Sequence, residues 1–162
     1  LKTPLSLLRF PIKLVNLLIK KRISISFAES CTGGLLSSAI TSIPHASKVF
    51  KMGLITYSNH SKNKLLKISK NLLNKYGAVS KPVCLAMANS INKIAKTDLS
   101  ISITGIAGTS GGTPLKPVGL IYIGIKFRKK LVCKKFLIKN KNRNYVQKET
   151  VKKTLRLLSN LI

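Results

Sequence analysis

The chain has 162 residues, a hydrophobic fraction of 44% and a formal charge of +27 at neutral pH. This length fits one domain, and the apolar content excludes a largely disordered chain. No apolar run approaches the roughly 18 residues that a membrane-spanning helix requires. The first residues also lack the pattern of an export signal. We therefore expect one domain over residues 1–162 that spans no membrane.

Three cysteines, Cys31, Cys84 and Cys133, are odd in number and widely spaced. No Cys-x-x-Cys pair occurs, so neither a zinc knuckle nor a disulfide framework is indicated. The two histidines, His45 and His60, are too few for a catalytic zinc site, which usually takes three protein ligands. We expect no metal site, and a reducing cytoplasm is the simplest location for such a chain.

Lysine supplies 25 of the 30 positive charges, and only three side chains are acidic. A strongly basic chain suggests nucleic-acid binding. Base readout and bidentate phosphate recognition favour arginine, however, and the lysines are spread from Lys2 to Lys153. We interpret the charge as drift of the genome toward A+T-rich codons, with the lysines on solvated faces.

Hydrophobic spacing predicts helices that alternate with strands. Apolar residues at Leu8, Ile12, Val15 and Ile19 indicate a first helix over 5–21, although Pro11 lies inside it. The other predicted helices are 35–42, one or two pieces within 61–76, 82–96 and 144–162, the last with Val151, Leu155 and Leu158 on one face; the predicted strands are 23–27, 49–58, 99–103, 120–127 and 131–138. This order predicts a three-layer α/β/α sandwich with a mixed sheet.

Three loops follow predicted strands, at 29–34, 57–62 and 104–119. Ligands in open α/β sheets bind beyond the carboxyl ends of the strands, so we expect these loops to converge on a site. The third loop is rich in glycine, and its amides could approach a phosphate. It matches neither common phosphate-binding motif, so this inference is weak by itself.

Ser30 lies in the first loop among small residues, where a serine is either a nucleophile or a helix cap. A nucleophile would find oxyanion donors in the N–H groups of residues 31–34. Both interpretations stay open on the pattern alone. Cys31 is an alternative nucleophile, but a small buried thiol is the simpler interpretation.

A nucleophilic serine needs a base, and the usual first candidates are His45 and His60, which we expect to be exposed. Only three carboxylates occur, so lysine is the remaining candidate. The pKa of a lysine base must fall from about 10.4 toward 7, and desolvation and nearby positive charge both act in that direction. Lys62 follows the second strand, but periodicity cannot choose it over Lys64 or Lys67.

Taken together, these segments resemble the C-terminal domain of the CinA family, the nicotinamide-nucleotide amidases. The resemblance covers about residues 12–160, and several unrelated motifs in one order make it specific. The motifs are Ala28-Glu-Ser-Cys-Thr-Gly-Gly34, Gly53-Leu-Ile-Thr-Tyr-Ser-Asn59 followed by Lys62, Gly77-Ala-Val-Ser80, Ser102-Ile-Thr-Gly-Ile-Ala-Gly108, Gly111-Gly-Thr113 and Lys116-Pro-Val-Gly119.

The resemblance implies hydrolysis of the carboxamide of nicotinamide mononucleotide to nicotinate mononucleotide and ammonia, in salvage of pyridine nucleotides. It implies Ser30 as nucleophile, Lys62 as base and Tyr57 as a support for this pair, with no metal and no organic cofactor. The substrate-binding residues that we expect from it are Thr32, Gly33, Thr104, Gly105 and Arg143. The sequence departs from the family pattern at His60, Thr109, Asn142 and Gln147.

The expected partner is therefore a small nucleotide substrate, with no specific nucleic acid and no membrane, while a homo-oligomer is compatible with the sequence. The alternative is a basic nucleic-acid-binding protein on the same fold with catalysis lost. An aromatic content of 6% leaves little for base stacking and disfavours single-strand binding. A decayed remnant is disfavoured because the expected site residues are intact.

Overall fold

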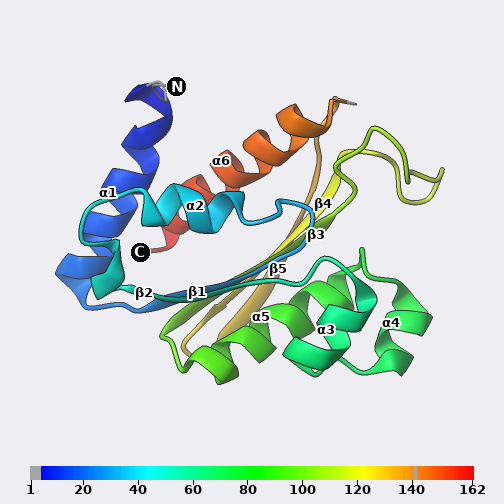
Figure 1. Ribbon diagram of the computed structural model, residues 1–162, viewed down its shortest axis with the longest axis horizontal. Helices are drawn as coiled ribbons and strands as arrows, with labels where there is room; N and C mark the ends of the chain where they lie inside the picture. Colours follow the sequence, from blue (N-terminus) through cyan, green and yellow to red (C-terminus); the bar gives the residue numbers. More distant parts are fainter. Residues whose placement is uncertain (1–4, 141) are drawn as a thin grey trace.

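The protein is described by a computed structural model that covers residues 5–140 and 142–162, with side chains from Arg9 onward. Five strands form one sheet in the order β2-β1-β3-β4-β5, and helices cover both of its faces (Figure 1). This arrangement confirms the predicted three-layer α/β/α sandwich with a mixed sheet.

The central strands β1 (Ile25–Glu29) and β3 (Leu99–Gly105) run parallel and are buried along almost their whole length. Such burial is typical of parallel strands with helices on both faces. The edge strand β2 (Phe50–Ile55) runs parallel to β1. On the other side, β4 (Leu120–Phe127) and β5 (Lys130–Leu137) form an antiparallel hairpin that continues from β3.

One face of the sheet carries α1 (Leu5–Lys21), α2 (Leu35–Thr41) and α6 (Arg143–Leu161), and the opposite face carries α3 (Asn59–Leu66), α4 (Lys70–Tyr76) and α5 (Lys81–Ala95) (Figure 1). A 3-10 turn, Ala46–Lys48, precedes β2. The predicted 61–76 segment is two helices because Lys67 adopts a left-handed conformation with φ of 56° and Ser69 caps the second helix. Within the described residues, no helix has both the length and the apolarity to cross a bilayer.

Each helical layer packs over its own apolar cluster. Leu14, Leu36 and Leu158 join one cluster with the strands on the α1–α2–α6 side, and Leu66, Met87 and Ile91 belong to the other. The predicted apolar face of α6 is confirmed, because Val151, Leu155 and Leu158 are all buried. The two clusters hold the sheet rigidly between the layers, which fixes the positions of its strand ends.

The predicted apolar face of α1 is confirmed at Val15 and at Ile19, which packs against the core, but it is wrong at Ile12. The helix buries Leu14, Val15 and Leu18 against its neighbours, while Ile12 is 43% exposed. Leu8, which belonged to the predicted face, lies outside the described side chains. Pro11 does not interrupt the helix.

Candidate active site

The carboxyl ends of β1, β2 and β3 lie at one edge of the sheet, as the three loops predicted. The N–H of Ser30 donates to the carbonyl of Ile103 at 3.0 Å, and the N–H of Thr56 donates to the carbonyl of Glu29 at 2.8 Å. These bonds continue the ladder just past the strand ends. The residues that follow β1 and β2 are therefore held side by side.

Ser30 and Lys62 meet at this edge. Nζ of Lys62 lies 3.0 Å from Oγ of Ser30 and 2.6 Å from the carbonyl oxygen of Thr56. Lys62 is only 1% exposed, and Ser30 is also buried. A capping box between Ser58 and Ser61 begins α3 immediately before Lys62, so the first turn of this helix aims the amine at the serine.

The pKa of Lys62 is lowered from the ordinary 10.5 to about 8, mainly because the side chain is buried. In the part of the chain that the structure describes, Lys62 forms no ion pair with a carboxylate that would reverse this shift. With a pKa about 8, roughly one amine in ten is neutral at pH 7. The amine beside Ser30 is therefore able to act as a base.

Cys31 follows Ser30 but is not activated in the same way. Burial raises the pKa of the Cys31 thiol to about 12, so that the sulfur stays protonated. A thiol is a much poorer nucleophile than a thiolate. The site chemistry therefore rests on the hydroxyl of Ser30 and not on this sulfur.

Glu29 organises the turn that carries Ser30, a role that the sequence analysis missed. Its fully buried carboxylate accepts hydrogen bonds from the hydroxyls of Thr32 and Ser37 at 2.7 Å each. It also accepts from the amides of Gly34, Leu36 and Ser37 at 3.2, 3.1 and 2.8 Å. The signal was an acidic residue just before a helix start, where the unpaired amides attract negative charge.

The hydrogen bonds of Glu29 also show that Ser30 is not the cap of α2. The N-cap of α2 is Gly34, with φ of 97° and no side-chain cap bond, while Glu29 satisfies the amides of the first turn. The hydroxyl of Ser30 faces Lys62 instead. The capping alternative is therefore wrong for this residue.

The amides of the turn are only partly occupied. The N–H of Gly33 donates to the carbonyl of Ser30 at 3.0 Å, and that of Gly34 is held by Glu29. Within residues 5–140 and 142–162, the N–H groups of Cys31 and Thr32 donate to no other residue. The expected set of oxyanion donors at 31–34 therefore narrows to these two amides.

Tyr57 and Arg143 form a second pair close to the first. The Tyr57 side chain is 59% exposed, and its hydroxyl accepts from Nη2 of Arg143 at 2.5 Å. Nη1 of the same guanidinium donates to the carbonyl of Gly108 at 2.7 Å. Lys62 meets Tyr57 through the backbone, with Nζ 3.5 Å from the Tyr57 carbonyl oxygen.

α6 brings Arg143 to the site. Asn142 and Gln147, two residues that depart from the family pattern, help to position this helix. Asn142 caps the helix by accepting from the N–H of Tyr145 at 3.0 Å. Gln147 donates to the carbonyl of Cys31 at 2.7 Å. Residues four apart share one helix face, so Arg143 lies one turn from a residue that touches the Ser30 turn.

Thr104 and Gly105 end β3 beside the serine turn. The Thr104 hydroxyl donates to the carbonyl of Ala78 at 2.9 Å, and its side chain is buried. A Cβ at Gly105 would lie 2.6 Å from the backbone carbonyl oxygen of Leu120, so packing against β4 requires glycine here. Both residues are at the expected edge, and the Thr104 hydroxyl is committed to the connection before α5.

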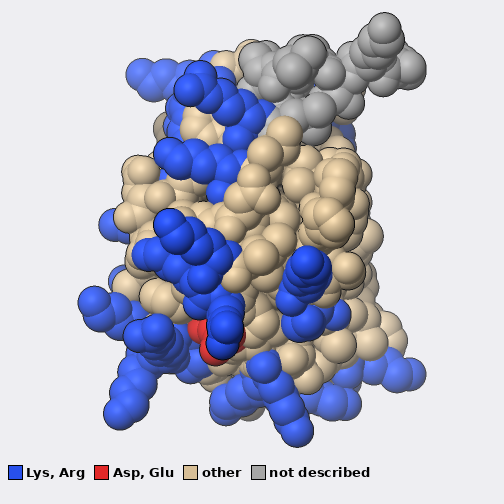
Figure 2. Space-filling view, turned by 90° about the vertical axis from the view of Figure 1, so that its left-hand side faces the viewer, with Lys and Arg blue, Asp and Glu red and all other residues tan. Residues whose placement is uncertain are grey.

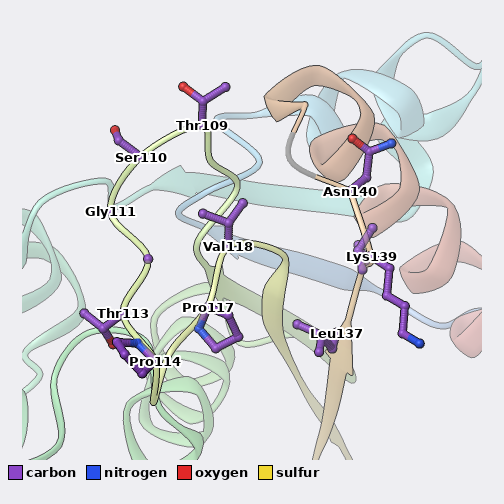
Figure 3. A pocket seen from close by; sticks show the side chains of 12 residues that line it. Thr109, Ser110, Gly111, Thr113, Pro114, Pro117, Val118, Leu137, Lys139 and Asn140 are labelled. Atoms are coloured by element: carbon purple, nitrogen blue, oxygen red, sulfur yellow. The ribbon is translucent and has the colours of Figure 1, made fainter.

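An open pocket of about 780 Å³ lies between the glycine-rich loop and the end of β5 (Figure 3). Its lining combines hydroxyls, prolines and aliphatic side chains: Thr109, Ser110, Gly111, Gly112, Thr113, Pro114, Pro117, Val118, Leu137, Ile138, Lys139 and Asn140. The first residue that lines the pocket follows Gly108, and Arg143 donates a hydrogen bond to the carbonyl of Gly108. Among the described residues, no three His, Cys, Asp or Glu side chains gather as metal ligands would.

Comparison with known proteins identifies a family that the chain matches. The model of the CinA C-terminal domain family matches residues 10–162. A CinA-like protein of Kosmotoga olearia is 51% identical over 133 residues, which are 80% of this chain and 32% of that protein. The chain thus spans about a third of the length of the curated relatives it matches, between 30% and 36%.

Solved structures agree over almost the whole chain. The competence/damage inducible protein CihA from Agrobacterium tumefaciens has a TM-score of 0.94 at 30% identity, and the match covers 99% of this chain and 98% of that one. A CinA superfamily protein from Escherichia coli has a TM-score of 0.92 at 28% identity, covering 100% and 94%.

Proposed function

Because the chain belongs to the CinA C-terminal domain family, we propose that it hydrolyses the carboxamide of nicotinamide mononucleotide to nicotinate mononucleotide and ammonia. The observation that carries the proposal is the 3.0 Å approach of a buried lysine amine to a buried serine hydroxyl, Lys62 to Ser30. The reaction would serve salvage of pyridine nucleotides in the cytoplasm.

The neutral amine of Lys62 begins the reaction. It takes the proton of the Ser30 hydroxyl as Oγ attacks the carboxamide carbon, and it then gives this proton to the leaving nitrogen. Ammonia departs, and the acyl group of nicotinate mononucleotide, with its ribose phosphate, stays on Oγ as an ester. A water molecule, deprotonated by the same amine, attacks the ester and releases the carboxylate product.

The amides of Cys31 and Thr32 stabilise the negative oxygen that forms at each attack. Both lie directly after Ser30 in a turn that Glu29 holds from within. Donors fixed before the reaction cost no reorganisation when charge develops, and one such donor is worth roughly 10²–10³-fold in rate. Lys62, once protonated, adds a positive charge on the other side of Oγ.

Arg143 and the adjacent pocket bind the phosphate and ribose of the substrate. The guanidinium is anchored to the Tyr57 hydroxyl and to Gly108, the residue just before the loop that lines the pocket, which fixes its plane. A fixed guanidinium binds a phosphate through two parallel hydrogen bonds. In this proposal Tyr57 orients Arg143, while Thr32, Gly33, Thr104 and Gly105 form the floor on which the nicotinamide ring lies.

The direct test measures ammonia release from nicotinamide mononucleotide by the purified protein and by two serine variants. Ser30→Ala removes the nucleophile and lowers kcat/KM by roughly 10³-fold or more. Ser42→Ala is the matched control, because the hydroxyl of this exposed serine at the end of α2 bonds only the carbonyl of Ala39 in the described structure. Equal turnover by Ser30→Ala and the unaltered protein would refute the mechanism.

A second measurement identifies the covalent step. Mass spectrometry of the protein quenched during turnover is expected to find the nicotinate mononucleotide ester on the peptide that contains Ser30, and none on Ser30→Ala. Ammonia release with the acyl group on Cys31 instead would retain the amidase and replace its nucleophile.

A further inference from the structure

Cys84 and Cys133 lie on the same side of the sheet, and the proposed reaction at Ser30 uses neither of them. Cys133 of β5 stands directly opposite Gly124 of β4. Residues directly opposite in an antiparallel pair project to the same face. A Cβ at Gly124 would lie 2.9 Å from the carbonyl oxygen of Cys84 and 2.4 Å from Oγ of Ser102. The Cys133 thiol therefore points toward α5.

Gly124 lets α5 approach the sheet closely at this point. With no side chain there, the backbone of α5 at Cys84 packs almost directly on β4, and Figure 1 shows this helix running along the face that β4 and β5 share. The Cys84 sulfur lies 3.3 Å from Oγ of Ser102 on the neighbouring strand. A disulfide requires two Cα atoms closer than about 7 Å, a separation that ordinary helix-on-sheet packing seldom gives. Gly124 provides a close approach of α5 to β4 directly beside Cys133.

The two thiols differ in accessibility and in acidity. The neighbouring Cys84 side chain is the largest cause that lowers the pKa of Cys133, and the charge of Lys81 acts in the same direction. Burial is the largest cause that raises the pKa of Cys84. Cys133 is half-buried, whereas Cys84 is buried. An accessible sulfur that ionises readily, next to a protected one, is the arrangement of an attacking and a resolving cysteine.

We propose that Cys133 and Cys84 are a peroxide-sensitive pair that forms a reversible disulfide between β5 and α5. The Cys133 thiolate attacks one oxygen of hydrogen peroxide, which becomes a sulfenic acid on Cys133 and a hydroxide ion. The Cys84 sulfur then attacks the Cys133 sulfur, its proton leaves with the displaced hydroxide as water, and the S–S bond forms. Two thiols and one peroxide give one disulfide and two waters, with two electrons passing from sulfur to oxygen.

The experiment treats the reduced, folded protein with one equivalent of hydrogen peroxide and maps its peptides without reduction. The expected result is one cross-link between the peptides of Cys84 and Cys133, with a mass lower by about 2 Da that dithiothreitol restores. Cys133→Ser should form no cross-link. Cys84→Ser should leave a sulfenic acid on Cys133 that dimedone traps.

The unaltered protein alone can overturn the proposal, so it does not depend on the folding of the variants. A cross-link of Cys84 to Cys31, dimedone on Cys133 without a cross-link, or no reaction would each contradict it. The same treatment in urea is the control, because unfolded chains should also cross-link Cys31. None of these results depends on amidase activity, so the two proposals fail separately.

Discussion

The two faces of α3 show what separates a base from an ordinary lysine. Lys62 and Lys64 lie two residues apart and so project to opposite sides of the helix. Lys64 is exposed, whereas Lys62 is buried with its amine on Ser30 and Thr56. The residue type and the helix are the same, so only the environment differs. Burial, and not abundance, makes one lysine a candidate catalyst.

The contrast extends to the surface of the whole molecule. Figure 2 shows Lys and Arg side chains spread over the face in view, without one continuous stripe. Such charges stay hydrated and change association and solubility more than chemistry. Lys62 is the only lysine buried among the described residues. The net charge of +27 therefore says little about the site.

Removing each of the two lysine amines is the strongest way to break this comparison. Lys62→Met keeps most of the volume but removes the base, so kcat/KM for amide hydrolysis should fall by roughly 10³-fold. Lys64→Met changes the same residue type on the solvent face and should leave the rate unchanged. Steady-state ammonia release measures both. Equal losses in the two variants would show that burial is irrelevant to the role.

Glu29 tests whether the site depends on a rigid turn as well as on a buried amine. Glu29→Gln turns an amide N–H₂ toward groups that are themselves donors, and the free energy of unfolding should fall by about 3 kcal/mol. Glu149→Gln is the matched control. Its carboxylate forms two long ion pairs, at 3.8 and 4.0 Å, with lysines at the surface of α6, and such surface pairs contribute about 0–1 kcal/mol. Urea unfolding compares them, and a similar small loss in both would contradict the role of Glu29.

Arg143 tests whether substrate binding and the chemical step depend on different residues. Arg143→Ala removes the anchored guanidinium, so KM for nicotinamide mononucleotide should rise by roughly tenfold or more while kcat changes less. Arg156→Ala serves as the control on the same helix, since this exposed side chain lies over the ring of Phe10. A loss confined to kcat would assign Arg143 to the reacting atoms instead.

The smallest expected effect concerns stability. Because burial lowers the pKa of Lys62 from 10.5 to about 8, holding its charged form in the folded protein costs about 3 kcal/mol at pH 7. Lys62→Met removes that penalty and loses two hydrogen bonds of about 1 kcal/mol each, which leaves a gain of about 1 kcal/mol.

The same variant has a pH signature. Between about pH 8 and pH 10.5 the unfolded lysine binds a proton that the folded one does not, so the stability of the unaltered protein rises through this window. The advantage of Lys62→Met should therefore shrink as the pH rises, vanish near about pH 9 and become a disadvantage of about 1–2 kcal/mol by about pH 10.5, because the two lost hydrogen bonds then outweigh the remaining penalty. Urea unfolding at a series of pH values measures it. A difference that does not vary with pH would contradict the account.

The sequence predicted the fold well because its central strands have a clear pattern. Alternating residues before Phe27 and Ile103 marked β1 and β3, although both strands continue two residues further, to Glu29 and Gly105. Those extra residues are small or polar, and tertiary hydrogen bonds and close packing accommodate them. The exposed position of Ile12 escaped prediction because α1 packs on neighbouring helices and not on the sheet alone.

The site was only partly predictable. Loops after three strands indicated its edge, but the choice of Lys62 came from family resemblance, since Lys64 and Lys67 fit the same pattern. Ser30 and Lys62 are 32 positions apart, and Tyr57 and Arg143 are 86 apart. Contacts at such separations depend on how the layers pack, which periodicity does not encode. Glu29 alone had a local signal.

The protonation of Lys62 in the folded protein tests the central claim most directly. Lysines labelled with carbon-13 beside the amine would be followed by NMR across the alkaline range, and Lys62→Met would identify the Lys62 signal. The account predicts a pKa of about 8 for Lys62, because burial disfavours its charge. Titration at the ordinary value of 10.5 would mean that this amine stays charged at neutral pH and cannot act as the base for Ser30.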